Sequence, residues 1–191
     1  AIIENIILYQ KAQTLAITDE LTGLYLYFYF YERLDYDIKR IQKKNSILTV
    51  LMIEIDNFKK INDTYSYAIG DEILIQSANI FKKCIRNVDL IARYGGDEFA
   101  IILSETSKEG AFITAERIRT QIEKTSFIIE EHNINITVSI GIASCPENAI
   151  TAKELVDKAD KAMYIAKKIG KNEINIFEEK NILEKGENEK K

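Results

Sequence analysis

Apolar residues recur along the chain in two patterns, which predict helices and strands. Spacing of three or four predicts helices from after Gly23 to about Lys44, over 68 to about 86, over 107–124 and over 151–168. Apolar runs rich in β-branched residues predict strands over 47–55, 90–94, 99–103, 127–129, 134–143 and 174–177. This order predicts an α/β (α+β) sandwich of the palm or ferredoxin-like type, with a central, mostly antiparallel sheet flanked by helices.

The two ends differ from this middle region. Residues 1–17 have apolar positions at helical spacing and no Gly or Pro, which predicts a linker helix entering from an upstream segment. Residues 178–191 are mostly Glu, Lys and Asn, which predicts a disordered tail. We therefore expect one domain over residues 18–177, cut from a longer protein.

The composition favours a compact domain that neither binds nucleic acid generally nor enters a membrane. With 46% hydrophobic residues and a formal net charge of −4, the 191-residue chain fits a compact domain without a general affinity for nucleic acid or anionic membranes. No uncharged stretch approaches the roughly 20 residues that span a bilayer, so we expect a cytoplasmic domain without membrane insertion. Cys84 and Cys145 lack metal-site spacing and are expected to be reduced core residues, while His132 is expected in a solvated loop.

Acidic residues gather at two predicted strand ends. Glu54 and Asp56 are two positions apart at the end of the predicted strand, so their side chains point to the same face. Asp97 and Glu98 follow two glycines in a predicted β-hairpin. Either segment alone is a common surface feature, but if the strands are neighbours the carboxylates converge and require a cation such as Mg²⁺ or Mn²⁺. Such a site suits phosphoryl or nucleotidyl transfer.

Several separated motifs resemble those of the GGDEF family of diguanylate cyclases over about residues 18–177. They occur in the family's order: Asp19-Glu20-Leu21-Thr22-Gly23-Leu24, Ile55-Asp56-Asn57-Phe58-Lys59-Lys60-Ile61-Asn62-Asp63, Gly70-Asp71, Arg93-Tyr94-Gly95-Gly96-Asp97-Glu98-Phe99, Val138-Ser139-Ile140-Gly141, Ala159-Asp160 and Ala166-Lys167-Lys168-Ile169-Gly170-Lys171-Asn172.

The resemblance implies a nucleotidyl-cyclase-type domain that condenses two GTP molecules into cyclic di-GMP and two pyrophosphates across a homodimer. It implies metal ligation by Glu54, the Ile55 carbonyl and Asp97, and catalysis by Asp97, Glu98 and Lys59. The GTP-binding residues that it implies are Asn57, Phe58, Lys59, Asn62, Tyr67, Asp71, Lys167 and Lys171. Without the other motifs, the last two lysines would fit a solvated helix face better.

A product-binding site is implied as well. Arg86 and Asp89 match the family's RxxD inhibitory motif, and Arg117 matches a secondary arginine of the same site. An arginine fork suits phosphate or guanine edges. A surface ion pair remains the alternative interpretation of this short pattern.

Three departures from the family pattern matter. Glu54 stands where the family has Asp, Leu26-Tyr27 where it has Asn-Arg, and Ser66-Tyr67 where it has Gly-His. Tyr67 either donates a hydrogen bond to the nucleotide or packs in the core. The aromatic residues from Tyr25 to Tyr31 are expected to pack in the core, with burial against a second chain as the alternative.

Two other functions remain open. A catalytically weak or inactive module would bind cyclic di-GMP or GTP as a signalling receptor. A related cyclase would use ATP, although Asp71 favours guanine because a carboxylate accepts from N1–H and the 2-amino group. For each of these functions, the expected context is an upstream sensory or receiver domain within a larger sensor, for which membrane attachment is one of the alternatives.

Overall fold

The computed structural model describes residues 17–179, so the predicted linker helix and almost all of the predicted tail lie outside the described residues. Its helices are α2 (Tyr27–Lys44), α3 (Phe58–Thr64), α4 (Tyr67–Lys83), α5 (Lys108–Lys124) and α6 (Ala152–Ile169). Its strands are β1 (Tyr25–Leu26), β2 (Leu48–Ile55), β3 (Leu90–Arg93), β4 (Glu98–Ser104), β5 (Phe127–Ile129), β6 (His132–Ile134), β7 (Val138–Cys145) and β8 (Ile174–Ile176).

Six of the strands form one sheet in the order β1-β3-β4-β2-β7-β8, and β5 and β6 form a separate hairpin. Strand β2 lies at the centre, antiparallel to both β4 and β7. The outermost pairs, β1 with β3 and β7 with β8, are parallel. This mostly antiparallel sheet confirms the predicted fold class.

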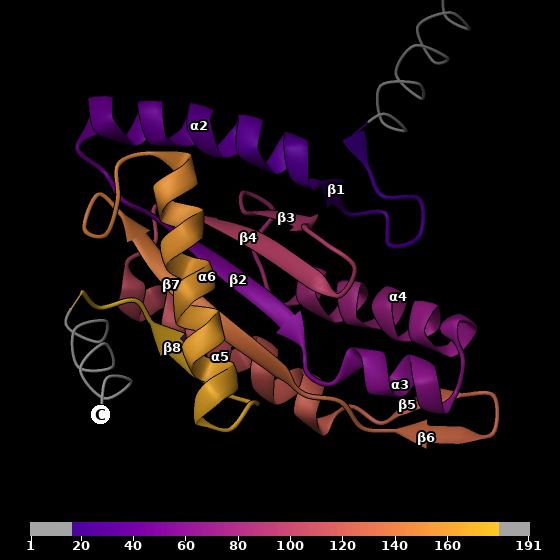
Figure 1. Ribbon diagram of the computed structural model, residues 1–191. Helices are drawn as coiled ribbons and strands as arrows, with labels where there is room; N and C mark the ends of the chain where they lie inside the picture. Colours follow the sequence, from indigo (N-terminus) through magenta and orange to yellow (C-terminus); the bar gives the residue numbers. More distant parts are fainter. Residues whose placement is uncertain (1–16, 180–191) are drawn as a thin grey trace, which may run out of the picture.

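Helices cover both faces of the sheet (Figure 1). One core joins α4 and α5 to the face that carries Leu51, Ile53 and Ile55 of β2. The other joins α2 and α6 to the face that carries Val50 and Met52. Alternate residues of β2 therefore enter opposite cores, which explains why this strand is apolar along nearly its whole length.

The region before α2 differs from its prediction. Tyr25 and Leu26 pair with Ala92 and Arg93 as strand β1, so the helix begins only at Tyr27. Cross-strand pairing at the sheet edge thus overrides local helical spacing.

The aromatic residues of this region are only partly in the core. Phe30 is fully buried, but Tyr27 and Phe28 are 56% and 42% exposed. Plain core packing was therefore wrong for those two positions. His132 is solvent-exposed as predicted but belongs to strand β6 rather than to a loop, and its ring lies 5.0 Å from that of Tyr65.

Helix α6 lies directly on β7 at Gly141. A Cβ atom there would lie 2.0 Å from the carbonyl oxygen of Ala159 and 2.2 Å from the backbone nitrogen of Met163. Thr151 caps the start of the same helix by accepting from the backbone N–H of Glu154. The missing side chain lets the helix backbone touch the strand, which fixes the position of α6 relative to the sheet.

Gly141→Ala is therefore expected to destabilise the fold by at least about 3 kcal/mol, because backbone atoms on both sides must move apart. Urea unfolding followed by circular dichroism measures this change. Gly96→Ala is the matched control, since nothing lies within 4 Å of its added methyl group. Equal unfolding free energies for the two variants would contradict the close packing of α6.

Candidate functional site

The carboxylates meet where β2 ends and the β3–β4 hairpin turns. The register places Glu54 directly opposite Glu98, and the backbone N–H of Ile55 donates to the carbonyl oxygen of Asp97 at 3.2 Å. The structure thus brings together the three predicted metal ligands. At Gly95 a Cβ atom would lie 2.5 Å from a carboxylate oxygen of Glu98, so this position leaves room for the Glu98 side chain.

The cluster carries more negative charge than its surroundings compensate. Burial, and then the nearby charge of Glu54, raise the pKa of Asp97 above its usual range. The same two causes raise the pKa of Glu98, with further contributions from Asp160 and Asp97. Burial also raises the pKa of Asp160 on α6. A site that disfavours its own ionised carboxylates is suited to a bound cation.

Lys167, in the last turn of α6, supplies positive charge to this cluster. Its ammonium nitrogen lies 2.5 Å from a carboxylate oxygen of Glu54, and both side chains are mostly buried. It also lowers the pKa of Asp97, Glu98 and Asp160, against the larger effect of burial. The predicted phosphate-binding lysine therefore contacts a predicted metal ligand.

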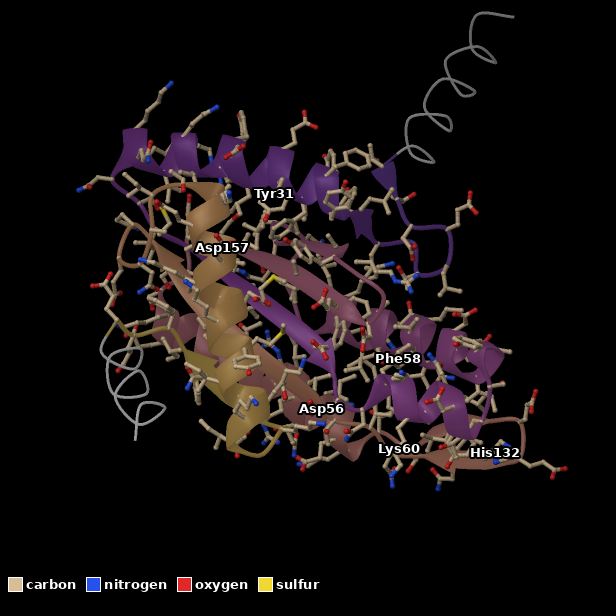
Figure 2. All side chains as sticks on the ribbon, in the orientation of Figure 1. Tyr31, Asp56, Phe58, Lys60, His132 and Asp157 are labelled. Atoms are coloured by element: carbon tan, nitrogen blue, oxygen red, sulfur yellow. The ribbon has the colours of Figure 1, made fainter. Side chains whose placement is uncertain are left out.

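Asp56 shares the face of Glu54, as predicted, but has a structural role. It is 3% exposed and accepts hydrogen bonds from Thr137 and Ser139, both at 2.7 Å, and from the backbone N–H of Asn172 at 2.9 Å. Figure 2 shows Asp56 at the end of β2, just before α3 with Phe58 and Lys60. The carboxylate joins β2, β7 and the turn after α6 at the edge of the site.

The remaining predicted phosphate-binding residues flank this edge. Asn57 precedes α3 with a positive φ of 58°, and its side-chain oxygen accepts from the ammonium of Lys171 at 2.5 Å. Lys59 is exposed in the first turn of α3, and Phe58 is partly buried against the core. Asn57 and Lys171 thus meet, while Lys59 projects into solvent beside them.

The predicted base-binding residues lie on α3 and α4. The side-chain oxygen of Asn62 is buried against Gly70, where a Cβ atom would come within 1.9 Å of it, and it has no hydrogen-bond partner in residues 17–179. Asp71 is exposed on α4. Tyr67 is 76% exposed, so core packing of its ring was wrong.

The predicted product site lies at the opposite end of β3 and β4 from the hairpin. Arg86 forms a forked pair with Asp89, with nitrogen–oxygen distances of 3.0 and 3.1 Å, and also donates to the carbonyl oxygen of Ser104. Arg86 and Asp89 line a cavity of about 350 Å³ together with Arg33 and Arg40. They line a second one, of about 400 Å³, together with Arg117.

Two contacts that position the hairpin were not predicted. Arg93 pairs with Asp19 at 3.2 Å and donates to the carbonyl oxygen of Gly96 at 2.8 Å. The hydroxyl groups of Tyr31 and Tyr94 lie 3.0 Å apart, and burial, followed by this hydrogen bond, raises the pKa of Tyr94. Asp19 and Arg93 stand inside the quoted motifs, which is the signal that could have revealed the first contact.

Comparison with known proteins gives a consistent result. Residues 16–173 match the family described as diguanylate cyclase, GGDEF domain. The chain is 43% identical over 185 residues to diguanylate cyclase A of Treponema denticola, which covers 92% of this chain and 50% of that protein. It is 38% identical over 162 residues to the response regulator PleD of Caulobacter vibrioides, covering 84% and 36%. The chain thus spans half or less of these curated relatives.

Solved structures show the same similarity. The coiled coil and GGDEF domain of DgcB from Caulobacter crescentus, in complex with c-di-GMP, superposes with a TM-score of 0.85 at 26% identity, covering 91% of this chain and 93% of that one. The GGDEF domain of YfiN from Pseudomonas aeruginosa gives a TM-score of 0.80 at 34% identity, covering 82% and 98%.

The crowding of carboxylates predicts a pH-dependent stability effect of Glu98→Gln. Because the pKa of Glu98 is raised in the folded state, its contribution to stability falls as pH rises above its usual pKa. The variant should therefore melt about 2 to 4 °C higher than the wild type at pH 8, with the difference fading toward pH 4. Calorimetric scans at both pH values measure this, with exposed Glu131→Gln as control. An equal shift at both pH values would contradict the raised pKa.

Proposed function

Because the chain belongs to the GGDEF domain family of diguanylate cyclases, we propose that it condenses two GTP molecules into cyclic di-GMP and two pyrophosphates. The observation that carries this proposal is the half-buried carboxylate cluster formed by Glu54, Asp97 and Glu98. Its residues are those that the family motifs mark, and its excess negative charge suits a metal-bound triphosphate.

Glu54, Asp97 and the carbonyl oxygen of Ile55 would hold Mg²⁺ or Mn²⁺. The fit rests on the donor set, because carboxylate and carbonyl oxygens are the ligands that these hard cations prefer. No group of three or more acidic, histidine or cysteine side chains within residues 17–179 is arranged to hold a metal. The site would therefore depend on the main chain and on nucleotide oxygens as well. The metal would neutralise phosphate charge and acidify the attacking hydroxyl.

The protein's own groups would position the nucleotide and move the proton. Asp97 or Glu98 would accept the proton of the 3′-hydroxyl, a role that their raised pKa values favour. Lys59, Lys167 and Lys171 would bind phosphate oxygens, and Asn57 and Phe58 would contribute backbone N–H groups.

Base recognition would fall to the α3–α4 pair. The unpaired oxygen of Asn62 is an acceptor, and the guanine 2-amino group is a donor of the kind that it needs. Exposed Asp71 would accept from the same edge of the base, and Tyr67 would donate from its exposed hydroxyl. Adenine lacks both donors that Asp71 would accept, which supports GTP over ATP as substrate.

A homodimer follows from the reaction itself. Residues 17–179 of one chain form one such carboxylate cluster and would bind one GTP, whereas the product joins two nucleotides. Two half-sites must therefore face each other. In a longer protein, an upstream segment would set the alignment of the two half-sites in response to a sensory or receiver domain. We also propose that the GGDEF domain lies in the cytoplasm. Within residues 17–179, no helix is long and apolar enough to cross a bilayer.

Asp97→Asn is expected to reduce formation of cyclic di-GMP by about 100-fold or more, because it removes a charged ligand and a candidate base at once. The assay follows product by liquid chromatography after incubating the purified dimer with GTP and either Mg²⁺ or Mn²⁺. Asp35→Asn, at an exposed position of α2, is the control and should retain wild-type turnover. Absence of product from the folded wild-type dimer with both metals would overturn the proposed activity.

Cyclic di-GMP is also the proposed ligand of the Arg86 end of the domain. Two cavities meet there beside the exposed guanidinium, and the related DgcB structure is a complex with c-di-GMP. Product bound to Arg86, Asp89 and Arg117 would restrain the dimer and inhibit it. The same site supports the second candidate function, a receptor of low or no catalytic activity, which the substitution of Glu54 for Asp favours.

Arg86→Ala should abolish tight binding of cyclic di-GMP in titration calorimetry, since the fork that meets phosphate or guanine is lost. Lys124→Ala, which removes an exposed charge elsewhere, should bind as the wild type does. Turnover by the wild type that rises in Arg86→Ala supports product inhibition. Binding without turnover supports the receptor, and binding unchanged by the substitution contradicts both.

A further inference from the structure

Lys167 is the cation that contacts the carboxylate cluster in the structure. Among the ion pairs of residues 17–179, its bond to Glu54 is the one that reaches Glu54, Asp97 or Glu98. The neighbouring cations are engaged elsewhere: Arg93 with Asp19, and Lys171 with Asn57. Lys167 is therefore the cation that is paired directly with a predicted metal ligand.

The length of the Glu54 side chain favours this contact. Glu54 lies on the sheet face covered by α6, which the close approach at Gly141 holds near β7. Glutamate carries its carboxylate about one C–C bond farther from the strand than the aspartate usual in the family. The longer side chain brings the carboxylate of Glu54 nearer to the ammonium of Lys167 than an aspartate at this position would.

The two partners of this ion pair have incompatible tasks in the proposed function. A carboxylate bound to an ammonium has an oxygen that is not free for a metal, and a lysine bound to a carboxylate is not free for phosphate. Both charges are mostly withdrawn from water, with side-chain exposures of 18% for Glu54 and 27% for Lys167. Their separation thus needs replacement partners for both groups.

We propose that the Glu54–Lys167 pair is a latch that excludes bare metal and opens only when nucleotide and metal arrive together. The triphosphate would bind Lys167 and the metal would bind Glu54. Each ligand would thereby free the side chain that the other ligand needs. This inference rests on the proposed function. It makes the binding of metal and of GTP positively coupled in this chain.

The test measures Mn²⁺ binding by the electron paramagnetic resonance signal of free Mn²⁺. Without nucleotide, Lys167→Met should bind Mn²⁺ at least about fivefold more tightly than the wild type, because competition from the ammonium is lost. Lys168→Met removes the same charge from the adjacent exposed position, where the ammonium lies over the Tyr164 ring, and should have no comparable effect.

A non-hydrolysable GTP analogue should reverse the order. With the analogue present, Lys167→Met should bind Mn²⁺ roughly tenfold more weakly than the wild type, because the phosphate loses its lysine. Glu54→Asp is the second variant and keeps Lys167, which can still bind the phosphate. It should bind bare Mn²⁺ more tightly than the wild type, since the shorter carboxylate no longer reaches Lys167.

The outcomes separate the latch from the proposed function. If Mn²⁺ binds with the analogue, but neither Lys167→Met nor Glu54→Asp tightens binding of bare Mn²⁺, the latch is wrong and the metal site stands. If Lys168→Met tightens binding as much as Lys167→Met does, net charge explains the effect and the latch is wrong. If no variant binds Mn²⁺ with or without the analogue, the latch and the proposed metal site fall together.

Discussion

The antiparallel register of β2 against β4 is the constraint on which the site depends. It sets Glu54 opposite Glu98 and brings the backbone of Asp97 to that of Ile55. A slip of one residue would turn Glu54 toward α4 and α5 and place core residues in the site. The buried faces of β2 on both sides exclude that slip, since every apolar residue of the strand is committed to one core or the other.

The same register brings the carboxylates of Glu54, Asp97 and Glu98 close together, and the surrounding contacts compensate their repulsion only in part. Asp56, two positions along the chain from Glu54, accepts hydrogen bonds from Thr137, Ser139 and the backbone of Asn172. Among the described residues, the cluster of Glu54, Asp97 and Glu98 has one ion pair, from Lys167, with a weaker influence of Arg93 on Asp97. Glu54 and Asp56, two positions apart in the chain, thus have opposite roles. One stabilises the junction of β2, β7 and the turn after α6, and the other holds unfavourable charge at a site of binding.

Most of the strands and helices and the two halves of the carboxylate site could be predicted, because each follows from a local pattern or a contiguous motif. The single strand predicted over 134–143 was wrong, since it is divided between β6 of the hairpin and β7 of the main sheet. What could not be predicted are contacts between distant segments. Tyr31 and Tyr94 are 63 positions apart, and Asp19 and Arg93 are 74 apart, and no periodicity links them. The pairing of Tyr25 and Leu26 with β3 is likewise non-local, so the local sequence predicted a helix there instead of a strand. The exposure of Tyr67 depends on how α4 sits, which its aromatic side chain does not reveal.

The Arg86 cavities and the carboxylate hairpin are two ends of the same strand pair, β3 and β4. These strands are joined residue by residue from Leu90–Ile102 to Arg93–Phe99 and are buried on both faces. A fully bonded, close-packed ladder of this kind neither stretches nor bends on demand. A ligand at the arginine end would therefore leave the shape of the hairpin unchanged and act by changing where the whole domain stands. In the proposed dimer, such regulation would change the position of one rigid domain relative to its partner and not the geometry within either carboxylate cluster.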